Sequence, residues 1–232
     1  GYDVRAAGRS LSKLKGRPWA RNSKVELAKV DVLNPESIKE AAMGCSEAFY
    51  LVSTINSRKK DVTKADRRAA RNVAKAADQA GLKRIIHLGY MGRDGDGRRL
   101  NSKRSANEAA NILQCGPVSV TVFRVAMILG SGSIFFETLR YLVDRMPVMI
   151  TPRWVNTVCQ PIAIHNVLNY LTGCLEQEET VGKTFDIGGP DVLTYREMMD
   201  IYAEEAHLPK RLMIPGPFVT TDLSAYWIHL IS

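Results

Sequence analysis

Arg9 and Ser10 are the first residues of the chain whose types and position could bind a ligand. They follow a short apolar segment, residues 4–7, which we expect to be a buried strand. In sheets that bind dinucleotides, the end of the second strand meets the adenosine ribose, and a basic residue there can accept a 2′-phosphate. Arginine suits this role because its guanidinium donates two parallel hydrogen bonds. A solvated turn explains the same two residues equally well from their spacing alone.

Two glycine stretches resemble the phosphate-binding pattern G-x-G-x-x-G, in which bare backbone N–H groups approach a pyrophosphate. Gly89-x-x-Gly92-x-x-Gly95 follows a predicted strand but leads into a charged segment, which favours a flexible loop. Gly130-x-Gly132 precedes a predicted helix and could hold an anion, although a tight turn is the better interpretation. Neither stretch is the complete pattern.

Evidence for a catalytic nucleophile or a metal site is weaker still. The sequence has no nucleophile elbow, no Ser/His/Asp order and no Cys-x-x-Cys pair. His87 lies inside a predicted strand and is better explained as a packed core residue than as a base. The cysteines stand singly, which favours reduced thiols and a cytoplasmic protein: Cys45, Cys115, Cys159 and Cys174.

The segments that must position these residues alternate between strand and helix patterns. Asn34-Pro35-Glu36 combines a cap, a first-turn proline and an acid, and so predicts a helix start. Residues 60–80 place alanine and valine at helical spacing. Four segments are expected to be strands of a buried sheet: residues 25–30, 48–52, 83–88 and 119–124, of which 48–52 is a continuous apolar run. This alternation predicts right-handed βαβ units and a parallel sheet, fold class α/β.

Two more candidate residues follow from this arrangement. Asp31 ends the strand at residues 25–30, near the position where an adenine would lie, although a turn or cap aspartate is an equal alternative. Tyr90 opens a segment rich in glycine and charge, residues 90–99, which we expect to be a mobile loop. Open α/β sheets place their ligands at such carboxyl ends of strands.

Composition narrows the class of protein. The 232 residues suffice for one large α/β domain with a small appended lobe, and no apolar run approaches the roughly 18 residues of a membrane span. The net charge of +8 comes from scattered basic residues without interleaved aromatics. This pattern favours a solvated surface with one anion site over nucleic-acid binding. We therefore expect neither nucleic acid nor membrane as a partner.

Beyond residue 147 the pattern of the chain loosens. Short strands are expected near residues 148–151 and 184–187, with a helix at 164–175 between them. Thr194-Tyr-Arg-Glu197 is a capping box and predicts a further helix start. We expect a sheet domain at residues 1–130 and a smaller lobe at residues 131–232.

Several segments, taken together and in order, resemble the atypical short-chain dehydrogenase/reductases, that is, the NmrA-like and epimerase-like NAD(P)-binding proteins. The matching segments are Arg9-Ser10, Val30-Asp31-Val32, Phe49-Tyr50-Leu51-Val52, Gly81-Leu82-Lys83-Arg84-Ile85-Ile86, Thr121-Val122-Phe123-Arg124, Gln160-Pro161-Ile162-Ala163-Ile164 and Phe185-Asp186-Ile187-Gly188-Gly189-Pro190. The resemblance implies a Rossmann-type parallel sheet flanked by helices, with a smaller α+β C-terminal substrate lobe.

The resemblance also assigns residues to a cofactor. It places Arg9 and Ser10 by the 2′-phosphate of NADP. The resemblance thus implies that NADP is preferred over NAD. The other implied cofactor contacts are Asp31 and Val32 at the adenine, and Leu51, Val52 and Ser53 at the adenosine and ribose. Tyr90 and Arg124 would face the nicotinamide or the substrate.

The chain departs from the family pattern in two respects. The glycine-rich TGxxGxxG stretch belongs immediately before Gly1, and the chain after Ser224 resembles the lead into another domain, so we expect a fragment of a longer polypeptide. The family's Tyr-x-x-x-Lys proton-transfer pair falls on Ser102 and Ala106, and neither can take that role. The resemblance implies an oxidoreductase that transfers hydride to a carbonyl, quinone or sugar, with a non-catalytic NAD(P)-sensing or scaffold protein as the alternative.

Overall fold

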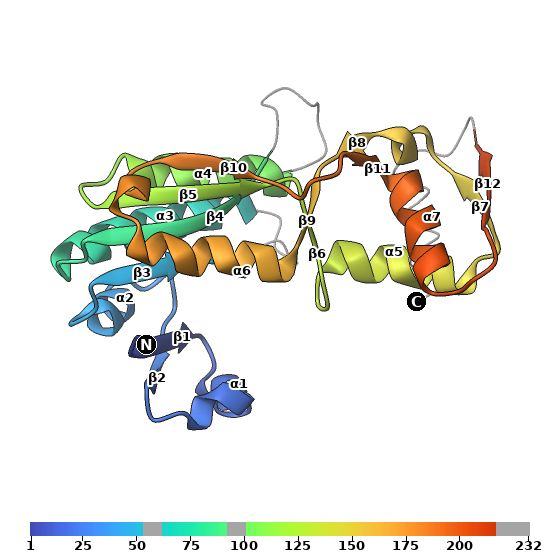
Figure 1. Ribbon diagram of the computed structural model, residues 1–232. Helices are drawn as coiled ribbons and strands as arrows, with labels where there is room; N and C mark the ends of the chain where they lie inside the picture. Colours follow the sequence, from blue (N-terminus) through green and yellow to red (C-terminus); the bar gives the residue numbers. More distant parts are fainter. Residues whose placement is uncertain (53–61, 92–100, 217–232) are drawn as a thin grey trace. The chain divides into compact units, whose positions relative to one another are not determined.

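The computed structural model describes residues 1–52, 62–91 and 101–216, except for the side chains of residues 62–63, 101–107 and 215. The chain divides into two compact units (Figure 1). Unit 1 comprises Gly1–Arg124 and Leu171–Asp186, and unit 2 comprises Val125–Tyr170 and Ile187–Ser232. The chain therefore passes from unit 1 into unit 2 and returns to each of them once.

Unit 1 alternates strands with helices, as the sequence predicts. Its main elements are β1 (Val4–Gly8), α1 (Leu11–Lys15), β2 (Val25–Lys29), α2 (Pro35–Ala42), β3 (Glu47–Tyr50), α3 (Val62–Gln79), β4 (Arg84–Tyr90), α4 (Asn101–Gln114), β5 (Ser119–Val125) and β10 (Thr184–Ile187). Short 3-10 turns complete it at Pro18–Arg21, Cys174–Glu176 and Glu178–Thr180. The predicted α/β class, with a Rossmann-type parallel sheet flanked by helices, is confirmed.

The strands of unit 1 form two parts among the described residues. β1 pairs in parallel with β2, and β3 pairs in parallel with β4 within a four-stranded sheet of order β10-β5-β4-β3. The usual strand order of doubly wound nucleotide-binding folds is 3-2-1-4-5-6. β2 and β1 correspond to strands 3 and 2 of that order, and β3, β4 and β5 correspond to strands 4, 5 and 6.

Small side chains let the helices of unit 1 pack closely against the sheet. Ala70 of α3 is fully buried, and Ala109 and Leu113 of α4 are 5% and 0% exposed in the same core. A Cβ added at Gly116 would lie 3.2 Å from the Cβ of Ala74, so glycine is needed where the chain leaves α4. The alanine-rich stripe of residues 60–80 is therefore a packing surface, as the sequence indicates.

Unit 2 is built from short elements. They are β6 (Met127–Leu129), α5 (Ile134–Arg145), β7 (Val148–Thr151), β8 (Val158–Cys159), β9 (Pro161–Ala163), α6 (Ile164–Gly173), β11 (Leu193–Thr194), α7 (Tyr195–Glu205) and β12 (Leu212–Pro215). β6 pairs in parallel with β9 and β7 with β12, whereas β8 and β11 are antiparallel. Buried methionines dominate the core of this unit: Met127, Met149, Met198, Met199 and Met213.

Several local features differ from the sequence-based expectations, among them the short strands β6, β8, β9 and β11, which were not expected. α6 ends at Gly173, and residues 174–176 form a 3-10 turn instead of the last helical turn. α1 was not expected, nor was β12, which pairs with β7. The capping box at Thr194 and Glu197 is present in both directions, as predicted. No helix in the described part of the chain is long and apolar enough to cross a bilayer.

Candidate functional site at the carboxyl ends of the strands

The candidate ligand residues of unit 1 follow the carboxyl ends of its parallel strands. Gly8, the last residue of β1, pairs in register with Lys29, the last residue of β2. The residues that follow these two strands, Arg9 and Asp31, therefore lie at the same edge. Tyr50 likewise pairs with His87 near the ends of β3 and β4. The fold thus brings the predicted residues of each strand pair to one edge.

Arg9 is exposed, and it forms no hydrogen bond or ion pair with any described residue. Ser10 caps α1 by accepting a hydrogen bond from the backbone N–H of Lys13 at 3.4 Å. The hydroxyls of Ser10 and Ser12 share a hydrogen bond of 2.9 Å. The end of β1 is therefore followed by an exposed arginine without a partner among the described residues, by two serines whose hydroxyls are hydrogen-bonded to each other, and by the exposed Lys13.

Asp31 closes the turn that leads from β2 into α2. Its Oδ1 accepts a hydrogen bond from the backbone N–H of Leu33 at 3.0 Å, and its own N–H donates to Oγ of Ser37 at 3.1 Å. The carbonyl oxygen of Val32 accepts a hydrogen bond from Nδ2 of Asn72 at 3.0 Å. Asp31 therefore stabilises this turn. Contact of Asp31 and Val32 with an adenine stays a prediction.

Leu51 and Val52 leave the end of β3 with exposed side chains, at 54% and 43%. Directly before them, the rings of Tyr50 and His87 are buried and 5.4 Å apart, and Nδ1 of His87 donates to the carbonyl oxygen of Tyr50 at 2.8 Å. Burial, with a smaller contribution from the charge of Asp66, raises the pKa of Tyr50 to about 12. His87 is thus a core residue, as predicted. The exposed Leu51 and Val52 directly follow this buried, hydrogen-bonded pair of rings. Ser53 lies outside the described residues.

Arg124 is held by a partner that the sequence did not reveal. Its Nε and Nη2 donate to the two carboxylate oxygens of Asp186 at 2.6 and 2.9 Å. This bidentate hydrogen bonding raises the pKa of Arg124. Asp186 lies on β10, next to β5 in the sheet, and both side chains are nearly half exposed. A guanidinium neutralised in this way is a weaker attraction for an anionic ligand than a free one.

Tyr90 is half-buried at the last residue of β4. A Cβ added at the preceding Gly89 would lie 3.9 Å from Cγ of Arg124, so Tyr90 and Arg124 end neighbouring strands. Contact of either residue with a substrate stays a prediction. Gly92 and Gly95 lie outside the described residues. Ser102 and Ala106 fall within α4, but their side chains are outside the described set.

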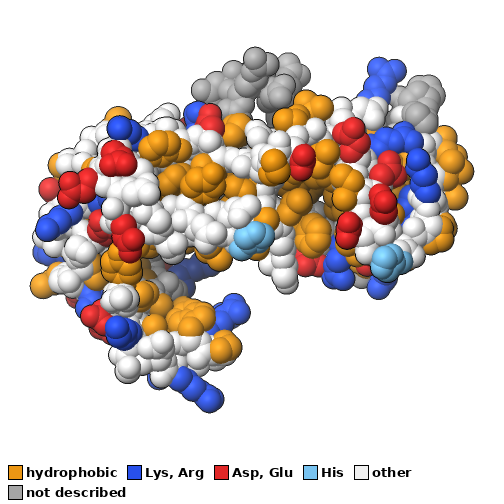
Figure 2. All heavy atoms as spheres, viewed as in Figure 1, with side chains coloured by type: hydrophobic (Ala, Val, Ile, Leu, Met, Phe, Trp, Pro, Cys, Tyr) orange, Lys and Arg blue, Asp and Glu red, His pale blue; other side chains and the backbone are white. Residues whose placement is uncertain are grey.

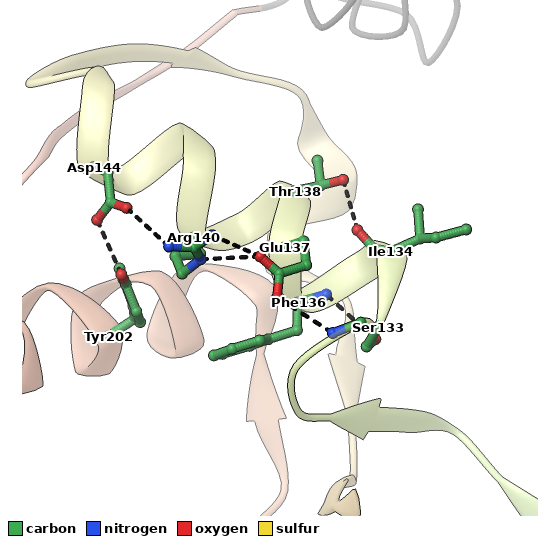
Figure 3. Close-up of polar contacts among 9 residues, drawn as sticks. Ser133, Ile134, Phe136, Glu137, Thr138, Arg140, Asp144 and Tyr202 are labelled. Carbon is green, nitrogen blue, oxygen red and sulfur yellow. Dashed lines mark hydrogen bonds and ion pairs between the residues drawn. The ribbon is translucent and has the colours of Figure 1, made fainter. Parts of the chain in front are cut away.

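The glycine turn before α5 is filled by the helix itself (Figure 3). Gly132 adopts φ 85°, and its N–H donates to Oε1 of Glu137 at 3.3 Å. Ser133 caps the helix by accepting from the N–H of Phe136 at 3.4 Å. Hydrogen bonding to Arg140, and secondarily to the Gly132 N–H, lowers the pKa of Glu137. Because a carboxylate already occupies the start of α5, the tight turn is the role that the structure shows.

Glu137 is also the first of a series of polar contacts that join α5 to α7 in unit 2 (Figure 3). Nη2 of Arg140 lies 2.7 Å from Oε2 of Glu137, and its Nη1 lies 4.0 Å from Oδ2 of Asp144. Asp144 in turn accepts a hydrogen bond of 2.9 Å from the Tyr202 hydroxyl on α7. These groups stabilise the contact between α5 and α7 rather than facing a ligand.

Two of the segments that carry the family resemblance meet in unit 2. Nε2 of Gln160 donates to the carbonyl oxygen of Gly189 at 2.6 Å, and the N–H of Gly189 donates to the carbonyl oxygen of Pro161 at 2.8 Å. A Cβ at Gly188 would lie 2.7 Å from Cδ of Gln160, and one at Gly189 would overlap the carbonyl oxygen of Pro161. The two glycines therefore serve close backbone packing. No group of His, Cys, Asp or Glu in the described part of the chain could hold a metal ion.

Comparison with known families adds to this geometry. A family model described as NAD(P)H-binding matches residues 1–125, more than half of the chain. The chain belongs to this NAD(P)H-binding family. The match ends at the last residue of β5, so it covers every strand end described above except that of β10.

One curated relative is subunit 9 of the 1 alpha subcomplex of the mitochondrial NADH dehydrogenase [ubiquinone] of Arabidopsis thaliana. It is 26% identical over 146 residues, which is 61% of this chain and 36% of the relative. The chain thus spans little more than a third of the length of the relative that it matches.

Several solved structures share the fold. A nucleoside-diphosphate-sugar epimerase from Staphylococcus aureus has a TM-score of 0.76 at 18% identity, with 96% of this chain and 73% of that chain covered. The Citrobacter sp. triphenylmethane reductase complexed with NADP(H) has a TM-score of 0.71 at 18% identity, with 98% and 79% covered. WbmG of Bordetella bronchiseptica in complex with NAD and UDP has a TM-score of 0.71 at 13% identity, with 93% and 75% covered. These similarities concern the fold.

Proposed function

We propose that the carboxyl ends of β1, β2 and β3 bind NADP(H), and that the protein is an oxidoreductase acting on a carbonyl, quinone or sugar. One observation carries the cofactor assignment: Arg9 is exposed and has no hydrogen-bond or ion-pair partner among the described residues, and it directly precedes Ser10, whose hydroxyl shares a hydrogen bond with that of Ser12 after the end of β1. A guanidinium with nearby hydroxyls suits a phosphate monoester better than a ribose diol, which an acidic residue would bind.

The residues present fit the adenosine end of such a cofactor. Arg9 and Ser10 would hold the 2′-phosphate, and the exposed side chains of Leu51 and Val52 offer apolar area to the adenosine. The described residues offer fewer free backbone N–H groups to the pyrophosphate. Among the described glycine turns, the N–H of Gly132 already donates to Glu137. When bound, the nicotinamide supplies the hydride, and the protein orients it and excludes water.

The comparisons support a nicotinamide cofactor without choosing its form. The family description names NAD(P)H. The Citrobacter reductase is complexed with NADP(H), and WbmG is complexed with NAD. The preference for NADP(H) in this chain therefore depends on Arg9 and Ser10.

Calorimetric titration of the full-length polypeptide with NADPH and with NADH tests the cofactor assignment. We expect tighter binding of NADPH, because two charge-assisted hydrogen bonds to the 2′-phosphate are worth about 1.5–3 kcal/mol each. Equal affinity for the two cofactors would remove Arg9 from the binding site.

A non-catalytic NAD(P)-sensing or scaffold protein is the second candidate, and three observations favour it. Arg124, on the strand next to that of Tyr90, is neutralised by Asp186. The positions of the family's proton-transfer pair hold Ser102 and Ala106. The Arabidopsis relative is itself a subunit of a larger NADH dehydrogenase. NADPH oxidation with a panel of quinones and carbonyl compounds separates the candidates, since a sensor binds the cofactor without turnover.

The remaining assignments are part of the same proposal. The partners would be a nucleotide cofactor and a small-molecule substrate, without nucleic acid. The ranges 1–130 and 131–232 would serve cofactor and substrate respectively. A cytoplasmic location accords with four free cysteines.

A further inference from the structure

The sheet formed by β7 and β12 exposes an aliphatic face that the described residues of unit 2 leave uncovered. Four of its side chains are exposed, at 49% for Val148, 60% for Ile150, 57% for Leu212 and 46% for Ile214. The register pairs Leu212 with Val148 and Ile214 with Ile150, so the four side chains form two adjacent cross-strand pairs. We name this surface the aliphatic face.

The aliphatic face is firmly held. Met149 and Met213, which alternate with its residues, point to the opposite side and are 4% and 5% exposed in the core of unit 2. The buried Arg211, directly before β12, donates from Nε to the carbonyl oxygen of Val143 at 2.8 Å. A two-stranded sheet fixed in this way keeps its outer side chains exposed instead of turning them inward.

The exposed charged side chains nearest in sequence to β7, and the one that precedes β12, are basic. The exposed side chains of Arg145 and Arg153 lie just before and just after β7, and Lys210 lies two residues before β12. The sequence contains no Asp or Glu in residues 145–175 or 206–221. Asp144, next to Arg145, is engaged by the hydroxyl of Tyr202. Figure 2 shows hydrophobic side chains with Lys and Arg beside them at the edge of unit 2 where Figure 1 draws these strands.

We infer that the aliphatic face docks onto the surface of an anionic phospholipid membrane. An apolar surface flanked by cations matches an interface in which side chains enter the acyl boundary and basic groups meet anionic headgroups. Four half-exposed aliphatic side chains fall well short of the roughly 800 Å² per partner of a stable protein complex.

This contact differs from a membrane span. The sequence-based expectation of no membrane partner depended on the lack of a long apolar segment, and no described helix could cross a bilayer. Docking through a sheet face needs only a few apolar side chains at the level of the headgroups. The inference is independent of the proposed cofactor, which concerns unit 1.

Co-sedimentation of the 232-residue chain with vesicles tests the inference. One set of vesicles contains phosphatidylcholine alone, and the other contains phosphatidylcholine mixed with phosphatidylglycerol. We expect binding to the anionic vesicles alone, and we expect it to weaken as salt screens the charges. Double substitution Ile150→Thr and Ile214→Thr keeps β-branched side chains in the strands while adding hydroxyls, and should lower the partition coefficient at least about tenfold. The matched control is Val158→Thr with Val192→Thr, two side chains of the same unit that are each 62% exposed.

Charge substitution gives a second test that leaves the sheet intact. Arg145→Gln with Lys210→Gln should lower binding roughly 30-fold, because each basic residue near an anionic surface contributes about 1 kcal/mol. Arg71→Gln with Lys75→Gln, exposed cations of α3, removes the same charge elsewhere. The inference is overturned if anionic vesicles do not bind, or if the control pairs reduce binding as much as the test pairs. Light scattering that finds a dimer, dissolved by Ile150→Thr with Ile214→Thr, would assign the face to a second copy instead.

Discussion

The two units of this chain bury their cores by different means. In unit 1, long helices rich in alanine pack on parallel strands, and Ala70 and Leu113 are fully buried there. In unit 2, the core is rich in methionine, and the sheets have two strands each. Methionine is flexible and fills irregular spaces, whereas alanine sets a fixed distance between a helix and a sheet. The regular unit therefore contains a four-stranded sheet, whereas the sheets of the irregular unit have only two strands.

Their polar groups differ in the same way. In unit 1, Arg9 lies at a strand end without a partner among the described residues. In unit 2, three of the four charged residues of α5 pair with one another: Glu137, Arg140 and Asp144. A ligand gains most from a group that it does not have to take from another partner. This comparison supports the proposal that the cofactor binds unit 1.

Substitutions in the two cores should give the largest change in the free energy of unfolding. Ile85→Ala in unit 1 removes a side chain that is 1% exposed and should lower the free energy of unfolding by about 2–5 kcal/mol. Met199→Leu in unit 2 conserves volume and should cost less than about 1.5 kcal/mol. Urea denaturation followed by circular dichroism measures both. Equal losses would mean that the methionine core is packed as tightly as the alanine and isoleucine core.

The next effect appears at alkaline pH and belongs to unit 1. The pKa of Tyr50 is raised from 10.0 to about 12, mainly by burial, so the folded state keeps the phenol proton longer than the unfolded chain. The contribution of Tyr50 is therefore complete below pH 10 and is lost as the pH rises toward 12. Stability should fall by about 1.4 kcal/mol per pH unit in this window.

Tyr50→Phe is the control for that slope. The variant should lose the Tyr50 part of the alkaline decline while it keeps the part caused by other groups. An unchanged pH profile in Tyr50→Phe would show that the phenol is not the titrating group.

Replacing one glycine of each unit by alanine should give smaller changes in stability, and the two changes should have opposite signs. Gly189→Ala places a methyl group against the backbone of Pro161 and should cost about 1–3 kcal/mol. Gly173→Ala, at the helical φ −63° and with no atom within 4 Å of the added Cβ, should gain about 0.4–1 kcal/mol. Thermal unfolding compares them. A loss at Gly173 equal to that at Gly189 would contradict the close packing argued for the Gly188-Gly189 segment.

Sequence reasoning succeeded where an element is long and periodic. The stripe of residues 60–80 and the cap at Asn34 predicted α3 and α2, because local spacing and capping determine a helix. β12 was missed because a four-residue strand is fixed by its partner β7, about sixty positions earlier in the chain. α6 ends early at Gly173, which the apolar spacing alone does not reveal.

The candidate site was predictable only in part for a similar reason. A residue that follows a strand can be placed at an edge from sequence, as for Arg9 and Asp31. The pairing of Arg124 with Asp186 joins positions 62 apart, and it depends on β5 and β10 being neighbours in the sheet. Asp186 does lie in the Phe185-Asp186-Ile187 segment that carries the family resemblance, and this was the available signal.

The central claim is that Arg9 selects NADP(H), and calorimetry on the Arg9→Glu variant of the full-length polypeptide tests it most directly. The control is Arg21→Glu, an exposed arginine outside the proposed site with the same change in charge. We expect Arg9→Glu to weaken NADPH at least about tenfold, because a charge-assisted contact to phosphate is lost, while NADH binding stays the same. Equal NADPH affinity in Arg9→Glu and Arg21→Glu would contradict the account.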